Sequence, residues 1–298
     1  MRVLILGGAG MLGHKLGQVL GERFETYVAV RTEPGRLLRA GLFPTDRVVS
    51  GVDVLDADSL HRAFAAARPD VVVNAVGVIK QLPTASDPIA AITTNALLPH
   101  RLALACRAVG ARLVHFSTDC VFSGDRGSYR EDDTPDAHDL YGRSKLLGEV
   151  AGAGSLTLRT SIIGRELDTQ NGLVEWFLSN RGGQVNGYAQ VMYSGLPTIV
   201  LAEIVARLIA DFPELSGLYQ VASEPIDKYS LLRLVDDAYD ARVRIHPVDQ
   251  PRKDMSLDGR RFREATGIEI PPWSELVRRM AHDPTPYEQW RQVHAADR

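Results

Sequence analysis

A tyrosine and a lysine four residues apart, Tyr141 and Lys145, are the side chains of this sequence best suited to proton chemistry. They lie in the segment DLYGRSKLLGE, and residues four apart share one face of a helix. Thr118 supplies a hydroxyl directly after the strand-like segment RLVHFS. We expect the Lys145 ammonium to lower the pKa of the Tyr141 phenol and Thr118 to orient the acceptor oxygen. The three side chains predict a site that protonates a ketone oxygen during hydride transfer.

A glycine-rich turn at the start of the chain predicts where the hydride donor binds. The turn follows the first apolar run and consists of Gly7, Gly10, Met11, Leu12 and Gly13. Glycines at this spacing permit a tight turn, a close approach of backbone to a pyrophosphate and close packing of the next helix on the sheet. The N-terminus of that helix favours phosphate. We therefore expect a dinucleotide site at these residues.

The end of the second expected strand indicates which dinucleotide binds. An acidic side chain there would bind the ribose hydroxyls and favour NADH. This chain has Arg31 instead, and an arginine can pair with a 2′-phosphate. We expect NADPH, with NADH possible because Glu33 lies close by.

Two further segments at strand ends are candidate cofactor contacts. Asp53 and Val54 follow the third expected strand and could reach the adenine edge. Ala75, Val76 and Gly77 follow the fourth and could line the nicotinamide ribose, which Lys145 and Tyr141 would also contact. Ligands of such folds bind at the carboxyl ends of the strands, although these residues also fit ordinary loops.

The order of apolar runs in the first half of the chain predicts the fold. The expected strands are 2–6, 26–30, 47–51, 71–74, 112–116 and 157–159, and the helices between them include 11–23, 59–67 and 88–109. Continuous Val/Ile/Leu strands joined by helices are typical of a parallel sheet covered on both faces. We predict an α/β fold: a Rossmann-like, doubly wound parallel sheet with a smaller C-terminal substrate lobe.

The pattern changes after residue 160. Glycine and polar residues dominate 164–195, and later apolar runs predict helices at 198–212, 229–239, 260–266 and 273–282 with strands at 217–222 and 243–248. We expect a dinucleotide-binding Rossmann domain at 1–160 and a mainly substrate-binding lobe at 161–298. Some elements of that lobe should return to the first domain.

Composition argues against several classes of protein. The net charge is −3 with both signs scattered, so no basic stripe indicates nucleic-acid binding. No apolar run approaches the roughly 18–20 residues that span a bilayer, and the first one is too short for a signal peptide. Cys106, Cys120 and eight scattered histidines lack metal-site spacing, so we expect no metal. We expect a cytoplasmic protein that does not bind membranes, with a homodimer as a possible assembly.

Several long stretches of the chain resemble the extended short-chain dehydrogenase/reductases, and within them the dTDP-4-dehydrorhamnose reductases. They are GGAGMLG, STDCVFSGDRGSYREDDTPDAHDLYGRSKLLGE, LRTSIIGRE, SGLPT and PRKDMSLD. The resemblance implies a catalytic triad of Thr118, Tyr141 and Lys145. It also implies reduction of the C4 ketone of a nucleotide-linked 4-keto-6-deoxy sugar by NADPH or NADH, in polysaccharide precursor biosynthesis.

Two departures from the family pattern concern the sugar. Cys120 stands where the family often has an aromatic residue, and the segment VGVIKQLPT differs from the usual reductase sequence. Lys80 or Gln81 in that segment could meet a differently substituted sugar. A UDP-linked 2-acetamido-4-keto-6-deoxy sugar is therefore an alternative substrate. Asp119 fits either a turn or a contact with the substrate.

Three cations in irregular segments, Arg165, Arg252 and Lys253, are candidates to hold the nucleotide diphosphate of the substrate. Other functions remain open beside the reductase. A sugar-nucleotide dehydratase would typically have a glutamate after the Thr-Asp pair, where this chain has Cys120. An epimerase would use the same triad with tightly held NAD, against which Arg31 argues. A non-catalytic regulatory subunit is the alternative from another class.

Overall fold

The computed structural model describes residues 1–31, 37, 41–80, 86–167 and 169–296. Two residues considered above, Glu33 and Gln81, lie outside these ranges. Within them, no helix is long and apolar enough to cross a membrane.

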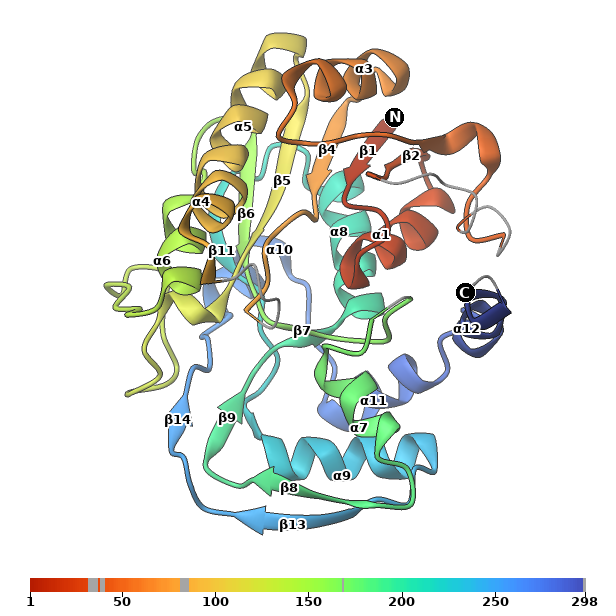
Figure 1. The fold of residues 1–298 in the computed structure, drawn as a ribbon. Helices are drawn as coiled ribbons and strands as arrows, with labels where there is room; N and C mark the ends of the chain where they lie inside the picture. The colour runs from red at the N-terminus through yellow and green to blue at the C-terminus, as the bar shows by residue number, and fades with distance from the viewer. Residues whose placement is uncertain (32–36, 38–40, 81–85, 168, 297–298) are drawn as a thin grey trace.

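A seven-stranded, fully parallel sheet forms the centre of the protein (Figure 1). Its strands, in spatial order, are β11 (Gly217–Gln220), β6 (Ser155–Arg159), β5 (Arg112–Ser117), β4 (Val71–Asn74), β1 (Arg2–Leu6), β2 (Glu25–Ala29) and β3 (Val48–Val49). The chain winds outward in both directions from β1 and β4, so the predicted doubly wound sheet is confirmed. In such sheets ligands bind where the strand order reverses, at the carboxyl ends of the strands.

Alternate residues of the strands enter two separate apolar cores. On β1, Val3 and Ile5 pack with α1 (Met11–Gly21) and α8 (Thr198–Asp211), whereas Leu4 and Leu6 pack with α3 (Ala57–Ala67) and α5 (Leu98–Val109). Successive strand residues point to opposite faces, so a strand covered on both faces must be apolar throughout. The run Arg2–Leu6 meets this requirement.

The helical stretch expected at 88–109 is interrupted. It consists of α4 (Pro88–Ala91), a π-helical segment, η3 (Ile92–Leu97), and α5. Such π segments often mark functional sites.

A smaller lobe lies below the sheet in Figure 1. Its elements are β7 (Ile162–Ile163), α7 (Leu173–Ser179), β8 (Gln184–Tyr188), β9 (Val191–Tyr193), β10 (Leu196–Pro197), β12 (Ile226–Asp227), α9 (Lys228–Tyr239), β13 (Arg244–Val248), β14 (Lys253–Asp254), α11 (Trp273–Ala281) and α12 (Tyr287–Ala296). α10 (Arg260–Thr266) lies beside β11 of the main sheet. The short strands form three small sheets, β12-β9-β14, β13-β8 and β10-β7. Elements after residue 160 also complete the main sheet, since β11 pairs with β6 and α8 packs beside α1.

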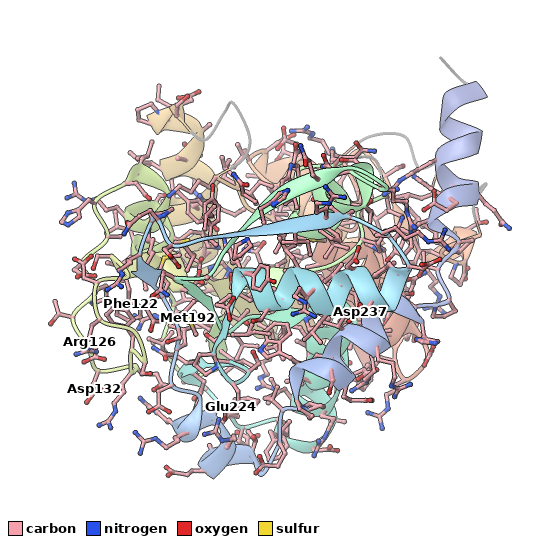
Figure 2. The ribbon with its side chains drawn as sticks, turned by 90° about the horizontal axis from the view of Figure 1, so that it is seen from below. Phe122, Arg126, Asp132, Met192, Glu224 and Asp237 are labelled. Atoms are coloured by element: carbon pink, nitrogen blue, oxygen red, sulfur yellow. The ribbon has the colours of Figure 1, made fainter. Side chains whose placement is uncertain are left out.

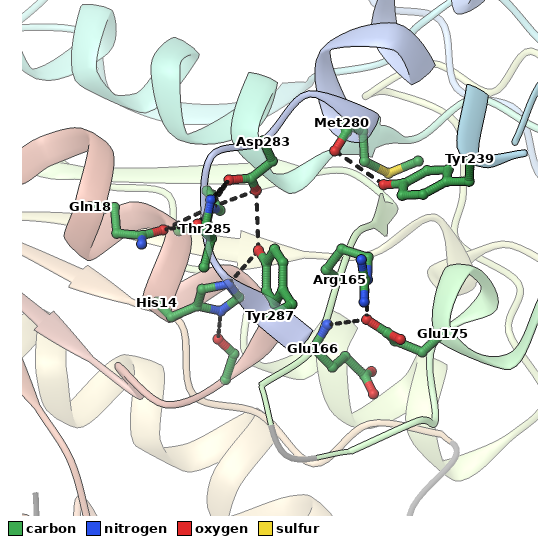
Figure 3. Close-up of polar contacts among 12 residues, drawn as sticks. His14, Gln18, Arg165, Glu166, Glu175, Tyr239, Met280, Asp283, Thr285 and Tyr287 are labelled. Carbon is green, nitrogen blue, oxygen red and sulfur yellow. Dashed lines mark hydrogen bonds and ion pairs between the residues drawn. The ribbon is translucent and has the colours of Figure 1, made fainter. Parts of the chain in front are cut away.

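The end of the chain packs against α1 through a buried polar network (Figure 3). The Lys15 ammonium lies 2.6 Å from a carboxylate oxygen of Asp283 and donates a hydrogen bond of 2.6 Å to Thr285. Next to it, His14 Nε2 lies 2.9 Å from the Tyr287 hydroxyl, and burial lowers the pKa of His14 to about 4. The network joins the last turns of the protein to the first helix.

Removing the carboxylate of this network should destabilise the fold. Asp283→Ala leaves the buried Lys15 without its counter-ion, and breaking a buried pair on one side typically costs about 3–5 kcal/mol. Asp237→Ala, an exposed position on α9, is the matched control and should change stability by less than about 0.5 kcal/mol. Chemical denaturation measures both, and equal stabilities of the two variants would contradict this role of Asp283.

Candidate active site

Thr118 and Tyr141 come together at the carboxyl end of β5. Thr118 directly follows the strand and caps η4 (Asp119–Val121); its hydroxyl lies 3.0 Å from Asp119 Oδ1 and accepts a hydrogen bond of 3.1 Å from the Cys120 N–H. Tyr141 is the second residue of α6 (Leu140–Leu147), and the Thr118 side chain is near enough to its phenol to lower the phenol's pKa. The structure thus brings two of the three predicted catalytic residues into contact.

A glycine lets α6 approach η4 closely enough for this contact. A Cβ atom on Gly142 would lie 2.7 Å from the Ala137 side chain and would overlap the Cys120 carbonyl. The helix begins here because the Asp139 side chain accepts a hydrogen bond of 2.7 Å from the Gly142 N–H. The sequence of α6 therefore fixes both where the helix starts and how near its tyrosine lies to Thr118.

Lys145 lies one turn after Tyr141 and is buried. Its ammonium donates a hydrogen bond of 2.5 Å to the Phe116 carbonyl of β5. Burial lowers the pKa of Lys145 to about 8, and the nearby Glu149 carboxylate opposes this shift. The side chain therefore both fastens α6 to the sheet and carries a titratable charge near neutral pH.

The electrostatics of Tyr141 differ from the sequence prediction. Burial raises the pKa of the phenol, and the neighbouring Cys120 and Asp119 act in the same direction, while the hydrogen bond with Thr118 opposes them. The expectation that Lys145 lowers this pKa is therefore wrong for the structure as it stands. Desolvation has the largest effect on this pKa, and the phenol is neutral at physiological pH, which is the form that donates a proton.

The glycine turn has the shape of a dinucleotide cradle. Gly7 has a φ of +86°, and a Cβ atom there would lie 3.1 Å from the backbone of Ala75. A Cβ atom on Gly13 would lie 2.7 Å from the Gly7 carbonyl carbon. Gly10 caps α1 without a side chain, so backbone can approach a ligand at the helix N-terminus. These residues fit a bound pyrophosphate.

The remaining predicted cofactor residues lie at the same edge of the sheet or beside it. Arg31 and Asp53 are exposed. The residues that precede them are neighbours, because the Val52 N–H donates a hydrogen bond of 2.9 Å to the Val30 carbonyl. Val54 is half-buried. Their contacts with a dinucleotide stay predictions.

Two groups of predicted residues next to the turn differ in exposure. Ala75 and Val76 are half-buried after β4 and Gly77 is exposed. Met11 is half-buried, whereas Leu12 is buried in the core and can reach a ligand only through its backbone.

Asn95 is a site residue that the sequence analysis missed. Its side-chain oxygen accepts a hydrogen bond of 2.9 Å from the Val78 N–H. Its side-chain nitrogen donates hydrogen bonds to the Val78 carbonyl at 3.0 Å and to the Ser144 hydroxyl of α6 at 3.2 Å. It thereby joins the segment after β4 to the helix that carries Tyr141. The sequence signal is weak, because Asn95 lies within the π segment of a continuous helical pattern.

The predicted substrate residues divide into two groups. Lys80, Asp119, Cys120 and Lys253 gather around Tyr141: Lys80 forms an ion pair of 2.7 Å with Asp139, and it interacts electrostatically with Asp119 and Cys120. Asp119 is buried, which raises its pKa. Lys253 interacts electrostatically with Asp139.

Arg165 and Arg252 belong to the second group. The Arg165 guanidinium is bound by Glu175 at 2.6 Å and Glu288 at 2.7 Å and lies over the Tyr287 ring, within the C-terminal network of Figure 3. These contacts favour a structural role over the predicted contact with the substrate. Arg252 is exposed, and its role stays a prediction.

A further cation near Tyr141, Lys228, was not predicted. It is the first residue of α9, and burial lowers its pKa while Asp119 and Cys120 oppose that shift. Nothing in the local sequence marks it, because its proximity to Asp119 arises from the packing of the two lobes.

Comparison with known proteins relates most of the chain to one family. The model of the RmlD substrate-binding domain matches residues 1–285. The chain is 36% identical over 151 residues to the dTDP-4-dehydrorhamnose reductase of Streptomyces griseus, a match that covers 50% of this chain and 44% of that protein. It is 25% identical over 251 residues to methionine adenosyltransferase 2 subunit beta of Bos taurus, covering 80% and 72%. The matches span about half the length of the curated reductases.

Solved structures share the fold over nearly the whole chain. A hypothetical dTDP-4-dehydrorhamnose reductase from Sulfolobus tokodaii has a TM-score of 0.74 at 26% identity, covering 92% of this chain and 98% of the other. The dTDP-4-dehydrorhamnose reductase of Bacillus anthracis in complex with NADP has a TM-score of 0.77 at 22% identity, covering 94% and 98%.

The close contact at Gly13 predicts a position-specific effect. Gly13→Ala places a methyl group against the Gly7 backbone and should lower the free energy of unfolding by about 1–3 kcal/mol. Gly21→Ala, in the same helix with no atom within 4 Å of an added Cβ, should cause no loss. Urea unfolding measures both. If the two variants were equally stable, the close packing of the turn on α1 would be refuted.

Proposed function

Because this chain belongs to the RmlD substrate-binding domain family, we propose that it reduces the C4 ketone of a nucleotide-linked 4-keto-6-deoxy sugar. The observation that carries the proposal is the neutral, half-buried phenol of Tyr141 near the Thr118 hydroxyl, with Lys145 one turn behind. The strands that precede Thr118 and the glycine turn, β5 and β1, flank β4 in the sheet. A proton donor and a dinucleotide cradle therefore share one edge.

The reaction divides between cofactor and protein. NADPH, when bound, supplies the hydride for C4 of the sugar. The Tyr141 hydroxyl donates its proton to the C4 oxygen, so that the phenolic O–H bond breaks as the new alcohol O–H bond forms. The Thr118 hydroxyl can rotate from Asp119 to hydrogen-bond the same oxygen. Lys145 stabilises the phenolate that remains, because its ammonium lies behind the phenol on the same helix.

NADPH is favoured over NADH by Arg31, which is exposed beside the end of β2 and can meet a 2′-phosphate. The UDP-glucose 4-epimerase of Thermus thermophilus, whose structure contains NAD, shares only the fold, at 22% identity. NADH remains the alternative cofactor.

The sugar is a dTDP-linked 4-keto-6-deoxy hexose, the substrate class of the reductases that the chain resembles. Cys120 acts on the Tyr141 phenol and Lys80 interacts with Cys120, and both belong to segments that depart from the reductase pattern. For this reason a UDP-linked 2-acetamido-4-keto-6-deoxy sugar is the alternative substrate.

A second candidate function is that of a partner subunit for another enzyme. The likeness to methionine adenosyltransferase 2 subunit beta favours it, because that match covers more of this chain than the reductase matches do. The complete set of Thr118, Tyr141 and Lys145 favours the reductase. A homodimer and a cytoplasmic location stay predictions.

A substrate panel tests the proposed function. The protein is mixed with NADPH and with dTDP- and UDP-linked 4-keto sugars, and the loss of nicotinamide absorbance is followed. Oxidation of NADPH with at least one sugar is expected. Absence of oxidation with every sugar would reject the reductase and favour the partner subunit, and a cofactor that survives gel filtration would favour an epimerase.

Loss of the phenolic hydroxyl should abolish most of the turnover. Tyr141→Phe is expected to lower kcat by about 10²–10⁴-fold, the usual contribution of a positioned acid, while the affinity for NADPH stays within about twofold. Tyr188→Phe, an exposed tyrosine on β8, is the control and should behave as the wild type. Unchanged kcat in the Tyr141 variant would reject the assigned role.

The pKa of Lys145 predicts an alkaline limit to activity. The ammonium is charged below about pH 8 and loses its proton as the pH rises through that value, so stabilisation of the phenolate is lost there. The kcat/KM for the ketone should therefore fall tenfold per pH unit above about pH 8. A profile that stays flat to pH 9.5 would show that the charge of Lys145 is not required.

A further inference from the structure

Two lysines near the Tyr141 site, Lys228 and Lys253, form no hydrogen bond or ion pair with the residues that the structure describes. The sequence holds five lysines, and three of them are engaged: Lys15 by Asp283, Lys80 by Asp139 and Lys145 by a backbone carbonyl. In the part of the chain that the structure describes, the Nζ atoms of Lys228 and Lys253 have neither a hydrogen bond nor an ion pair within 4 Å. A partly buried ammonium without a partner indicates that something outside the chain pairs with it.

The small sheet of the lower lobe brings these two lysines together. β9 lies between β12 and β14, and its Met192 is opposite both Asp227 and Asp254. Lys228 follows β12 directly, and Lys253 is the first residue of β14. In Figure 2 the N-terminal end of α9 lies toward Met192 and Phe122, and Asp237 lies toward the opposite side.

Both lysines interact with residues that also act on the Tyr141 phenol. Lys228 interacts electrostatically with Asp119, Cys120 and Lys253, and these first two neighbours also act on the Tyr141 phenol. The stem of Lys253 packs against Gly124, where a Cβ atom would lie 2.7 Å from the lysine Cγ. Gly124 has a φ of +89°, so its backbone and its missing side chain together leave room for the lysine.

The charges around these lysines do not balance. Asp139 already pairs with Lys80, and Asp119 is a buried carboxylate whose pKa is raised by desolvation. The two neighbouring ammonium groups repel each other; Asp119 acts on Lys228, and Asp139, already paired with Lys80, also acts on Lys253. An excess of positive charge next to the reacting ketone favours an anionic ligand.

We propose that Lys228 and Lys253 form an anion-binding subsite that holds the negatively charged group bonded to the reacting sugar. In a nucleotide sugar that group is the phosphate on C1, which lies only a few bonds from C4. A carboxylate on the sugar is the other source of the same chemistry. The subsite rests on the proposed function for its substrate class and adds Lys228 as a residue that determines specificity.

Binding of sugar nucleotides without turnover tests the subsite. Dissociation constants of dTDP-glucose, UDP-glucose and UDP-glucuronate are measured calorimetrically for the wild type and for Lys228→Gln. Loss of a charged partner of a phosphate should raise the dissociation constant at least about tenfold. Lys228→Arg keeps the charge and should stay within about threefold of the wild type.

A variant of the same helix controls for net charge. Arg233→Gln also removes one positive charge from α9, at an exposed position, and should change the dissociation constants by less than about twofold. Unchanged NADPH affinity of Lys228→Gln verifies that the variant is folded. Equal losses for all three sugar nucleotides identify the C1 phosphate as the ligand, and a loss confined to UDP-glucuronate identifies the sugar carboxylate.

The proposed subsite and the proposed reductase activity can be refuted independently. If Lys228→Gln binds every sugar nucleotide as the wild type does, or if the wild type binds none of them, the subsite is refuted. If the wild type turns over a 4-keto sugar and Lys228→Gln binds the sugar nucleotides as tightly as the wild type, the reductase is retained and the subsite is rejected. Weakened binding in Lys228→Gln without any wild-type turnover would retain the subsite and discard the reductase.

Discussion

The structure of the site depends on one buried hydrogen bond, that from the Lys145 ammonium to the Phe116 carbonyl. At 2.5 Å it fastens α6 to β5, and it places Tyr141 over the end of the strand where Thr118 begins η4. The bond satisfies a charge that burial would otherwise penalise heavily. Burial lowers the pKa of Lys145 but raises that of Tyr141, because the removal of water disfavours the phenolate and keeps the proton on the phenolic oxygen. One packing arrangement thus supplies a positive charge and a neutral acid side by side.

The rest of the fold places the other site residues near Lys145 and Tyr141. Parallel pairing of β1, β4 and β5 brings the glycine turn, the segment after β4 and Thr118 to one edge of the sheet. Asn95, in the π-helical segment η3, joins the segment after β4 to α6 through three hydrogen bonds. From the other side, the small sheet around β9 carries Lys228 and Lys253 to the same place. The reacting group would therefore lie between a rigid sheet edge and a lobe that supplies charge.

The sequence predicts the main sheet well because its strands are buried on both faces. The runs Arg2–Leu6 and Val71–Asn74 coincide with β1 and β4, since only continuous apolar residues satisfy two cores at once. The glycine turn and the Tyr141–Lys145 pair are equally local signals. The segment 164–195 contains α7, β8 and β9. Its sequence periodicity does not predict these elements, because they are short and half-exposed. The ion pairs of Arg165 and the convergence of Lys228 on Asp119 are contacts between distant segments, and no local pattern predicts them.

The central claim is that burial keeps Tyr141 as a neutral proton donor at physiological pH. Tyrosine labelled with ¹³C at Cζ, with the Tyr141→Phe variant to assign the signal, reports ionisation of this phenol directly by NMR. The Tyr141 resonance is expected not to titrate between pH 6 and about pH 10, the ordinary pKa of tyrosine. A Tyr141 signal that titrates near neutral pH would contradict it, because the phenol would then be governed by a neighbouring positive charge and not by its removal from water.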